Sequence, residues 1–152
     1  MRLTLLAVGK LRPALREAAD EYLRRLRRYA DVVEIEVREA GKAPNAEAGR
    51  RQEGTRLRER VPAGALVVAL DRQGQGWSSK ELAARLDRWQ AGSRPLALIL
   101  GGSDGLDPDL LTTASMRWSL GPITLPHQLA RVVVAEQLYR AFTILRGEPY
   151  HK

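Results

Sequence analysis

Hydrophobic residues along the chain follow two alternating patterns. Four short apolar runs of strand length occupy residues 3–8, 32–37, 65–70 and 96–100, and residues 116–120 form a candidate fifth strand. The runs at 65–70 and 96–100 show no polar alternation, which is typical of strands covered on both faces at the centre of a parallel sheet. Because stretches of helical period separate the runs, the sequence predicts an α/β domain with a mainly parallel sheet and helices on both faces.

The helical stretches differ in how clearly they are marked. Ser78 and Glu81 form a capping box, and Gly92 follows as a stop signal. The last stretch is apolar beyond one narrow stripe, which favours a subunit interface and a homodimer. Helices are predicted over residues 14–29, 46–60, 108–114 and 128–145, and between Ser78 and Gly92.

Composition narrows the class of protein. The 152 residues suit one domain, and 44% hydrophobic with 28% charged residues is typical of a globular chain. No apolar run approaches the roughly 18 residues of a membrane span, and the first residues indicate a strand rather than a signal peptide. Zero cysteines exclude disulfides and thiolate chemistry, and two histidines are too few for a histidine-based metal site. We therefore expect one domain over residues 1–152, without a metal or a membrane partner.

The charge of the chain indicates a kind of partner. The formal net charge is +7, and 21 of the 25 basic residues are arginine. A guanidinium forks onto phosphate and stacks on bases, so this excess favours a polyanion such as RNA. An arginine-rich proteome would produce the same bias without any nucleic-acid partner.

A glycine-rich loop follows the apolar run that ends at Leu100. Gly101, Gly102 and Gly105 lie within five residues, which allows positive φ angles and a close approach of the backbone to a ligand. The spacing is neither the G-x-G-x-x-G of dinucleotide folds nor a phosphate-binding P-loop. A tight turn without a ligand has the same pattern.

Residues 118–131 form a second candidate segment. Two prolines and a glycine fix an irregular backbone between residues 121 and 126, whose free amides and carbonyls can hydrogen-bond a nucleoside. His127 begins the long helix and Arg131 follows one turn later, so both project from the same face. The competing interpretation is that His127 caps the helix and Arg131 is a surface residue.

The C-terminal tail is the third candidate segment. Tyr150, His151 and Lys152 place an aromatic ring, an imidazole and an ammonium group directly after a proline. Chain ends usually fray, but these groups together also suit contact with RNA.

The three segments resemble the ribosomal RNA large-subunit methyltransferase H group of the SPOUT superfamily. The likeness extends to residues 5–10, 21–25 and 40–42, so it covers nearly the whole chain. Ser103 and Asp104 depart from the Pro-Glu pair expected in many relatives but keep the acidic character. The motifs that carry the resemblance occupy residues 98–106, 118–120, 124–132, 134–141 and 149–152.

The resemblance implies a fold, a cofactor and a substrate. It implies a C-terminal trefoil knot, a homodimer formed through the knot, and S-adenosylmethionine as methyl donor. The implied substrate is a pseudouridine of large-subunit ribosomal RNA, methylated at N3 by a cytoplasmic protein on free RNA, on the subunit or on the ribosome. The implied cofactor-binding residues are Leu70, Gly101, Gly102, Leu120, Gly121, Pro122, Ile123, Thr124 and Leu125.

Methyl transfer to N3 requires removal of its proton and stabilisation of an imide anion. We expect Arg131 to neutralise charge near the base and His127 or His151 to relay the proton. The resemblance further implies that Tyr150 and His151 of one subunit complete the site of the other.

Two other functions remain open. A noncatalytic RNA-binding ribosome-assembly factor would keep the arginines but need no ordered donor pocket. A nucleotide-binding oxidoreductase would use the glycine loop for a pyrophosphate, but the loop spacing and the required downstream acidic residue are missing.

Overall fold

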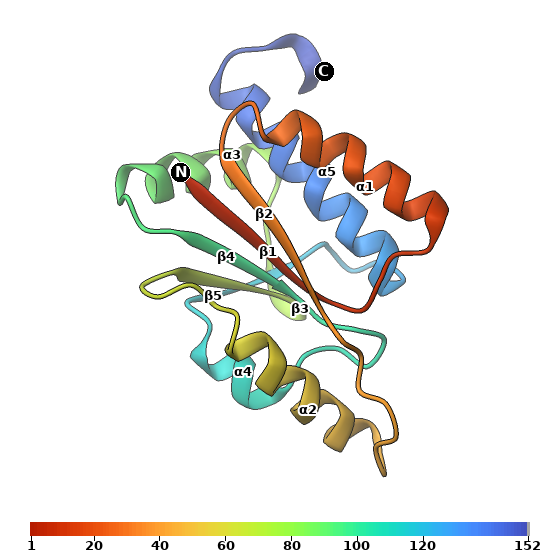
Figure 1. Ribbon diagram of the computed structural model, residues 1–152. Helices are drawn as coiled ribbons and strands as arrows, with labels where there is room; N and C mark the ends of the chain where they lie inside the picture. Colours follow the sequence, from red (N-terminus) through yellow and green to blue (C-terminus); the bar gives the residue numbers. More distant parts are fainter. Residues whose placement is uncertain (152) are drawn as a thin grey trace.

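The sheet that organises the chain is parallel throughout. The computed structural model describes residues 1–151, and its five strands lie in the order β2-β1-β4-β3-β5 (Figure 1). Every neighbouring pair of strands is parallel. The strands are β1 (Arg2–Val8), β2 (Asp31–Val37), β3 (Leu66–Gly76), β4 (Leu96–Leu100) and β5 (Met116–Ser119).

Helices cover both faces of this sheet, as the alternating pattern predicts. Figure 1 shows α1, α3 and α5 on one face and α2 and α4 on the other. A turn of 3-10 helix, η1 (Pro149–His151), follows α5. The helices are α1 (Pro13–Leu26), α2 (Ala46–Arg58), α3 (Ser79–Ala91), α4 (Pro108–Thr113) and α5 (His127–Leu145).

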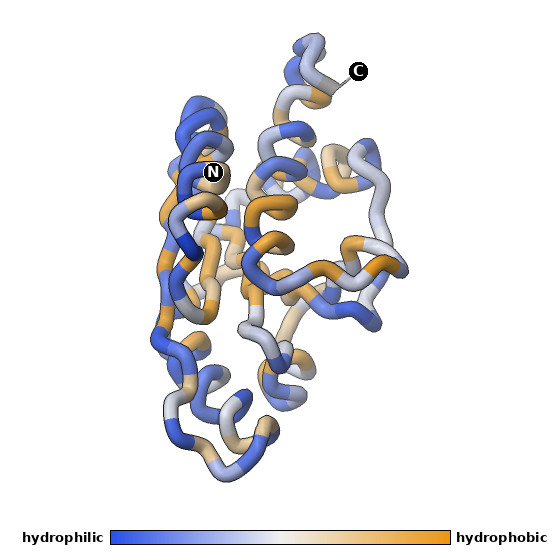
Figure 2. Tube along the Cα trace, turned by 90° about the vertical axis from the view of Figure 1, so that its right-hand side faces the viewer, coloured by the Kyte–Doolittle hydropathy of each residue, from blue (hydrophilic) through white to orange (hydrophobic). Residues whose placement is uncertain are grey.

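Alternation along the strands divides the core between the two faces of the sheet, and a small third cluster of Leu11, Ala19 and Val132 lies between α1 and α5. Leu3 and Leu5 of β1 point into a large cluster with side chains of α1, α3 and α5, while Leu6 and Val8 point into a smaller one with α2 and α4. Successive strand residues face opposite sides of a sheet, which explains the division. Figure 2 shows hydrophobic residues concentrated along the strands at the centre of the molecule.

Several predicted boundaries are wrong by a few residues, each for a tertiary reason. The first helix ends at Leu26 rather than at residue 29, because Tyr29 stacks on Phe142 and the Asp31 amide already bonds to the carbonyl of Met1. The third strand continues beyond Leu70 to Gly76 through a register shift, and Leu70 and Gln75 both pair with Trp118 of β5.

Two expectations about burial are only partly met. β4 is buried along its whole length, as predicted, but Leu66, Val67 and Leu70 of β3 are only half-buried. The wide apolar surface of α5 is used largely within the subunit, since side chains of α1, α3 and the sheet pack on it in one cluster. That width is therefore weaker evidence for a subunit interface than the sequence indicates.

Candidate functional site

A cleft of about 580 Å³ opens at the carboxyl-terminal edge of the sheet. It is bordered by residues 70–73 of β3, the loop 100–106 after β4, the loop after β5 and the first turn of α5. Ligands of parallel α/β sheets bind at this edge, and the volume suits a molecule of nucleoside size. The three loops that line it come from neighbouring strands, so parallel pairing alone brings them together.

The glycine loop forms one wall through its backbone. The Gly105 amide donates to the Gly102 carbonyl at 3.1 Å, which closes a tight turn. A Cβ atom on Gly101 would lie 2.6 Å from the carbonyl carbon of Gly105, so this close approach requires glycine. The loop therefore presents peptide groups to the cleft.

The loop after β5 forms the opposite wall. The Ser119 hydroxyl accepts from the Gly121 amide at 3.2 Å and lies 3.3 Å from the Gly121 carbonyl, which fixes the turn out of the strand. Ile123 is 75% exposed, an unusual state for an isoleucine. Leu120, Gly121, Ile123, Thr124 and Leu125 line the cleft together with Leu70, Gly101 and Gly102.

Pro122 is the one predicted cofactor residue of this loop outside the lining, within the part of the chain that the structure describes. It is exposed and lies between Gly121 and Ile123. Its ring fixes the backbone of the loop without facing the cleft.

Sequence reasoning missed the charged lining of the cleft. Asp71 and Arg72 lie on the unpredicted continuation of β3, and Arg50 reaches in from α2. The Arg50 guanidinium donates to the Asp104 carbonyl at 3.4 Å, and Asp71 pairs with Arg117 at 3.7 Å. The signal that was available is that Leu70 ends an apolar run next to the strand that ends at Leu100, so polar residues just after it belong to the same edge.

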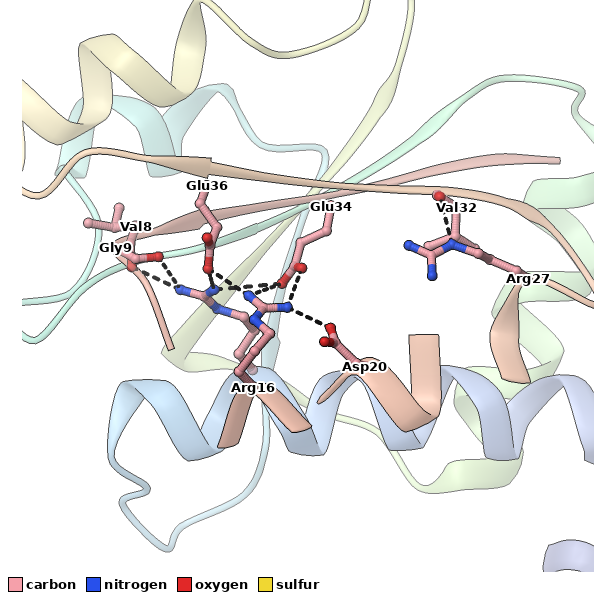
Figure 3. Close-up of polar contacts among 9 residues, drawn as sticks. Val8, Gly9, Arg16, Asp20, Arg27, Val32, Glu34 and Glu36 are labelled. Atoms are coloured by element: carbon pink, nitrogen blue, oxygen red, sulfur yellow. Dashed lines mark hydrogen bonds and ion pairs between the residues drawn. The ribbon is translucent and has the colours of Figure 1, made fainter. Parts of the chain in front are cut away.

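Of the predicted catalytic residues, His127 lines the cleft and Arg131 is bound elsewhere. Arg131 is only 3% exposed, and its guanidinium binds Glu36 of β2 and the carbonyls of Val8 and Gly9, the three partners labelled in Figure 3. The competing sequence interpretation of Arg131 as a surface residue is wrong. The sequence also predicts that its guanidinium lies near the reacting base. In the structure the guanidinium is instead occupied by these bonds, away from the cleft lining.

Tyr150 packs beside the middle of α5, away from the cleft. Its hydroxyl donates to Glu136 at 2.9 Å, and its ring packs edge-on against Tyr139 with centroids 4.6 Å apart. Burial, followed by the hydrogen bond to Glu136, raises the pKa of Tyr150. Glu136 is nine residues beyond His127, or about 13 Å along the helix axis. The tail of one chain is thus fixed away from its own cleft.

The side chain of His151 lies outside the described residues, although its backbone belongs to η1. The predicted catalytic set is therefore split along α5. His127 stands at the cleft in the first turn, and Tyr150 packs against Glu136 and Tyr139 further along the helix.

Residues 1–151 show neither a cluster of metal ligands nor a helix suited to cross a membrane. In that range, no three His, Asp or Glu side chains gather as ligands for a metal ion. The helices described there also lack the combination of length and apolar composition that crossing a bilayer requires.

The lining of the cleft is chemically mixed. Leucine side chains from three strands' ends provide apolar surface, the two loops provide peptide groups, and charged side chains of both signs stand around them. Apolar walls with a few polar groups are typical of sites for small organic ligands. A nucleoside-containing molecule fits this combination.

The sequence matches a known family along nearly all of its length. The family model described as "Predicted SPOUT methyltransferase" matches residues 1–151. "Ribosomal RNA large subunit methyltransferase H" of Pseudomonas aeruginosa PAO1 is 45% identical over 157 residues, covering 100% of both chains. The protein of the same description from Pseudomonas putida W619 has the same identity and coverage.

Solved structures agree at the level of fold. A probable methylase family protein from Haemophilus influenzae Rd KW20 has a TM-score of 0.59 at 12% identity, over 99% of this chain and 70% of that one. A probable methyltransferase from Bordetella pertussis Tohama I has a TM-score of 0.52 at 15% identity, over 92% and 95% of the two chains. At these identities the likeness concerns the fold alone.

Proposed function

This chain belongs to the SPOUT methyltransferase family, and from that membership we propose that it transfers a methyl group from S-adenosylmethionine to large-subunit ribosomal RNA. The observation that carries the proposal is 45% identity to "Ribosomal RNA large subunit methyltransferase H" over 100% of both chains. The target atom we propose is N3 of a pseudouridine, in keeping with the resemblance of the C-terminal motifs.

The cleft offers groups that suit each part of the cofactor. Leu70 and Leu125 supply apolar surface for an adenine, and the peptide groups at Gly101 and in the loop after β5 can hydrogen-bond its edge. Asp104 at the cleft suits the positive charge of a sulfonium. When bound, the cofactor supplies an electrophilic methyl group. We propose as its binding residues Leu70, Gly101, Gly102, Leu120, Gly121, Ile123, Thr124 and Leu125, with Pro122 shaping the loop.

His127 is the proposed proton acceptor on this chain. It lines the cleft from the first turn of α5, next to the loop that we assign to the cofactor. An imidazole can take a proton at neutral pH, which the N3 position must lose before or during attack. His151 remains the alternative acceptor, contributed by a second subunit.

The separation of tail and cleft supports a homodimer. Tyr150 is fixed beside Glu136 and Tyr139 in the middle of α5, whereas His127 stands at the cleft in its first turn. A two-fold axis that sets two α5 helices antiparallel would bring the tail of each subunit to the cleft of its partner. Ile123 and Leu145, which are 75% and 36% exposed, are apolar side chains at opposite ends of this helix and would be covered by such pairing.

An exposed group of arginines supports contact with RNA. Arg24, Arg27 and Arg28 at the end of α1, here called the arginine tip, are exposed, and none forms an ion pair within the described residues. The tip lies beside the tail, because the Tyr29 hydroxyl donates to Glu148 at 2.6 Å. In the proposed dimer, the tip of one subunit therefore stands near the partner's cleft. Ribosomal RNA as substrate also supports a cytoplasmic location, which we propose on that basis.

The proposal is tested by binding and transfer together. Calorimetry should detect binding of S-adenosylmethionine to the protein, and labelled methyl groups should then enter large-subunit RNA of ribosomes that lack the modification. Replacing Arg24 and Arg28 with Ala should reduce the slope of log affinity for RNA against log salt concentration by about 1 for each arginine removed. Arg88→Ala on α3, which is equally exposed, is the matched control. A protein that binds neither cofactor nor RNA would contradict the proposal.

A further inference from the structure

Arg131 stands out as a charged side chain buried in the first part of α5. It is 3% exposed, and burial of a guanidinium is tolerated only where its donors are used. We propose that Arg131 is a positioning residue, whose guanidinium fixes the first turn of α5, with His127, against the carboxyl ends of β1 and β2. The consequence for methyl transfer rests on the proposed function, whereas the positioning itself does not.

The partners of Arg131 come from the two neighbouring strands. Glu34 and Glu36 alternate along β2 and so face the same side of the sheet. One nitrogen of Arg131 binds Glu36 and lies 3.6 Å from Glu34. The other donates to the carbonyls of Val8 at 3.0 Å and Gly9 at 2.8 Å. The single side chain therefore bridges the ends of two strands, whose residues Val8, Gly9, Glu34 and Glu36 are labelled in Figure 3.

A second arginine shares the same carboxylates and provides a comparison. Arg16 of α1 binds Glu34 at 2.6 Å and Glu36 at 2.7 Å, and also Asp20 at 2.9 Å. Two guanidinium groups thus neutralise two carboxylates between the helices and the strand. Arg16 connects the two glutamates to α1, whereas Arg131 connects them to α5.

The start of α5 packs through Val132 on Leu11 and on Ala19 of α1, but it has few other polar contacts that fix its first turn. Its N-cap is Pro126, which has no side-chain capping bond, and its first turn contains no acidic residue. An exposed bond from the Arg12 amide to Gln128 is a further tie. Uncapped first turns fray readily. Arg131 lies one turn beyond His127 and is buried against four partners. It therefore holds the first turn in place, where no capping side chain does so.

The geometry of a guanidinium is essential to this role. The contact joins a carboxylate and two backbone carbonyls that lie in different directions, which a planar fork of donors can reach together. A lysine in this place keeps the charge but not the fork. The buried carbonyls of Val8 and Gly9 would then lose donors, and such groups are costly to leave unpaired.

The test compares Arg131→Met with Arg16→Met. Both variants remove a guanidinium from the same pair of glutamates and keep an unbranched side chain of similar length, so both should lower the thermal midpoint. Hydrogen exchange of the amides of residues 130–134, which begin the bonded part of α5, should speed up by about tenfold or more in Arg131→Met alone. Its affinity for S-adenosylmethionine should fall by a similar factor, and Arg16→Met should stay within about twofold of wild type on both measurements. Arg131→Lys should restore neither measurement fully.

Three results would overturn the proposal. Equal changes of exchange in the two Met variants would make Arg131 a general stability residue. Unchanged exchange in Arg131→Met would show that Arg131 does not fix the first turn of α5. Normal exchange and normal cofactor affinity with loss of methyl transfer would mean that Arg131 acts on the substrate directly. If Arg131→Met does not fold, Glu36→Gln takes its place and should speed exchange at residues 130–134 more than Asp20→Asn, which removes a partner of Arg16 only. A wild-type protein that binds no S-adenosylmethionine would refute the proposed function, while the exchange comparison would still decide the positioning role.

Discussion

His127 is the residue whose substitution bears most directly on the chemistry. We expect His127→Ala to fold, to bind S-adenosylmethionine within a few fold of wild type, and to lose methyl transfer by about 100-fold, the usual scale for a lost acid–base group. Single-turnover rates on ribosomes measure this. Asp87→Ala on α3, an exposed position outside the lining of the cleft, is the control and should keep near-normal rates. A normal rate in His127→Ala would exclude His127 as the proton acceptor and leave His151 of the partner subunit in that role.

Tyr29 gives the fold a dependence on alkaline pH. Burial, and then its hydrogen bond to Glu148, raises the pKa of Tyr29 to about 12. Folding therefore favours the protonated phenol, and its stabilisation is full below the ordinary tyrosine pKa of about 10 and is lost as the pH rises towards 12. Urea unfolding followed by circular dichroism should show this decline, and Tyr29→Phe should flatten it. Parallel declines in the two proteins would contradict the account.

Single residues were predictable where backbone chemistry marks them. The glycines after Leu100 and the Gly-Pro segment before His127 are visible in the sequence, and the structure brings both to one cleft. Arg131 could not be assigned in the same way. Its burial depends on Glu36 and on carbonyls of β1, which lie more than ninety positions away in the chain.

Among the elements, the glycine loop is the one with the least freedom to change. A Cβ on Gly101 would meet the Gly105 carbonyl carbon at 2.6 Å, so Gly101→Ala must displace the loop's own backbone. We expect a loss of stability of about 1–3 kcal/mol and weaker binding of S-adenosylmethionine. Thermal unfolding and calorimetry measure the two effects.

Gly41→Ala is the matched control for that substitution. A Cβ at Gly41 would meet nothing within 4 Å, so both quantities should stay close to wild type. Full stability and full cofactor affinity in Gly101→Ala would show that the loop tolerates displacement and would remove it from the proposed site.

Secondary structure was predictable because strand and helix periods are local properties. The capping box at Ser78 is present in full, and α3 begins at the next residue. The continuation of β3 from Asp71 to Gly76 is not local. It depends on pairing with β5, a strand more than forty residues further along, and no apolar pattern marks it.

At the scale of the whole molecule, the proposed homodimer is open to direct test. Val133→Asp and Leu145→Asp place charges on partly exposed positions of α5, and we expect each to lower the dimer fraction in light scattering at micromolar concentration. Thr112→Asp on α4, the opposite face of the sheet, is the control and should remain dimeric. Phe142 is unsuitable because it is only 2% exposed and its charge variant would disturb the core. A monomeric wild-type protein would refute the dimer.

The strand order β2-β1-β4-β3-β5 marks the limit of prediction from periodicity. Alternating strands and helices predict a parallel sheet, but many orders satisfy that pattern. Only the likeness to a known family specifies one, and the trefoil knot stays a prediction on the same basis. The cleft then follows, since the ends of β3, β4 and β5 meet at one edge.

The central claim is that this protein methylates a pseudouridine of large-subunit ribosomal RNA. Mass spectrometry of nuclease-digested RNA from a strain lacking its own methyltransferase of this kind, complemented with this chain, tests it most directly. The account predicts that one pseudouridine gains a single methyl group, located at N3 by fragmentation, and that complementation with His127→Ala does not restore it. An RNA without this gain, from cells that contain the folded protein, would contradict the account.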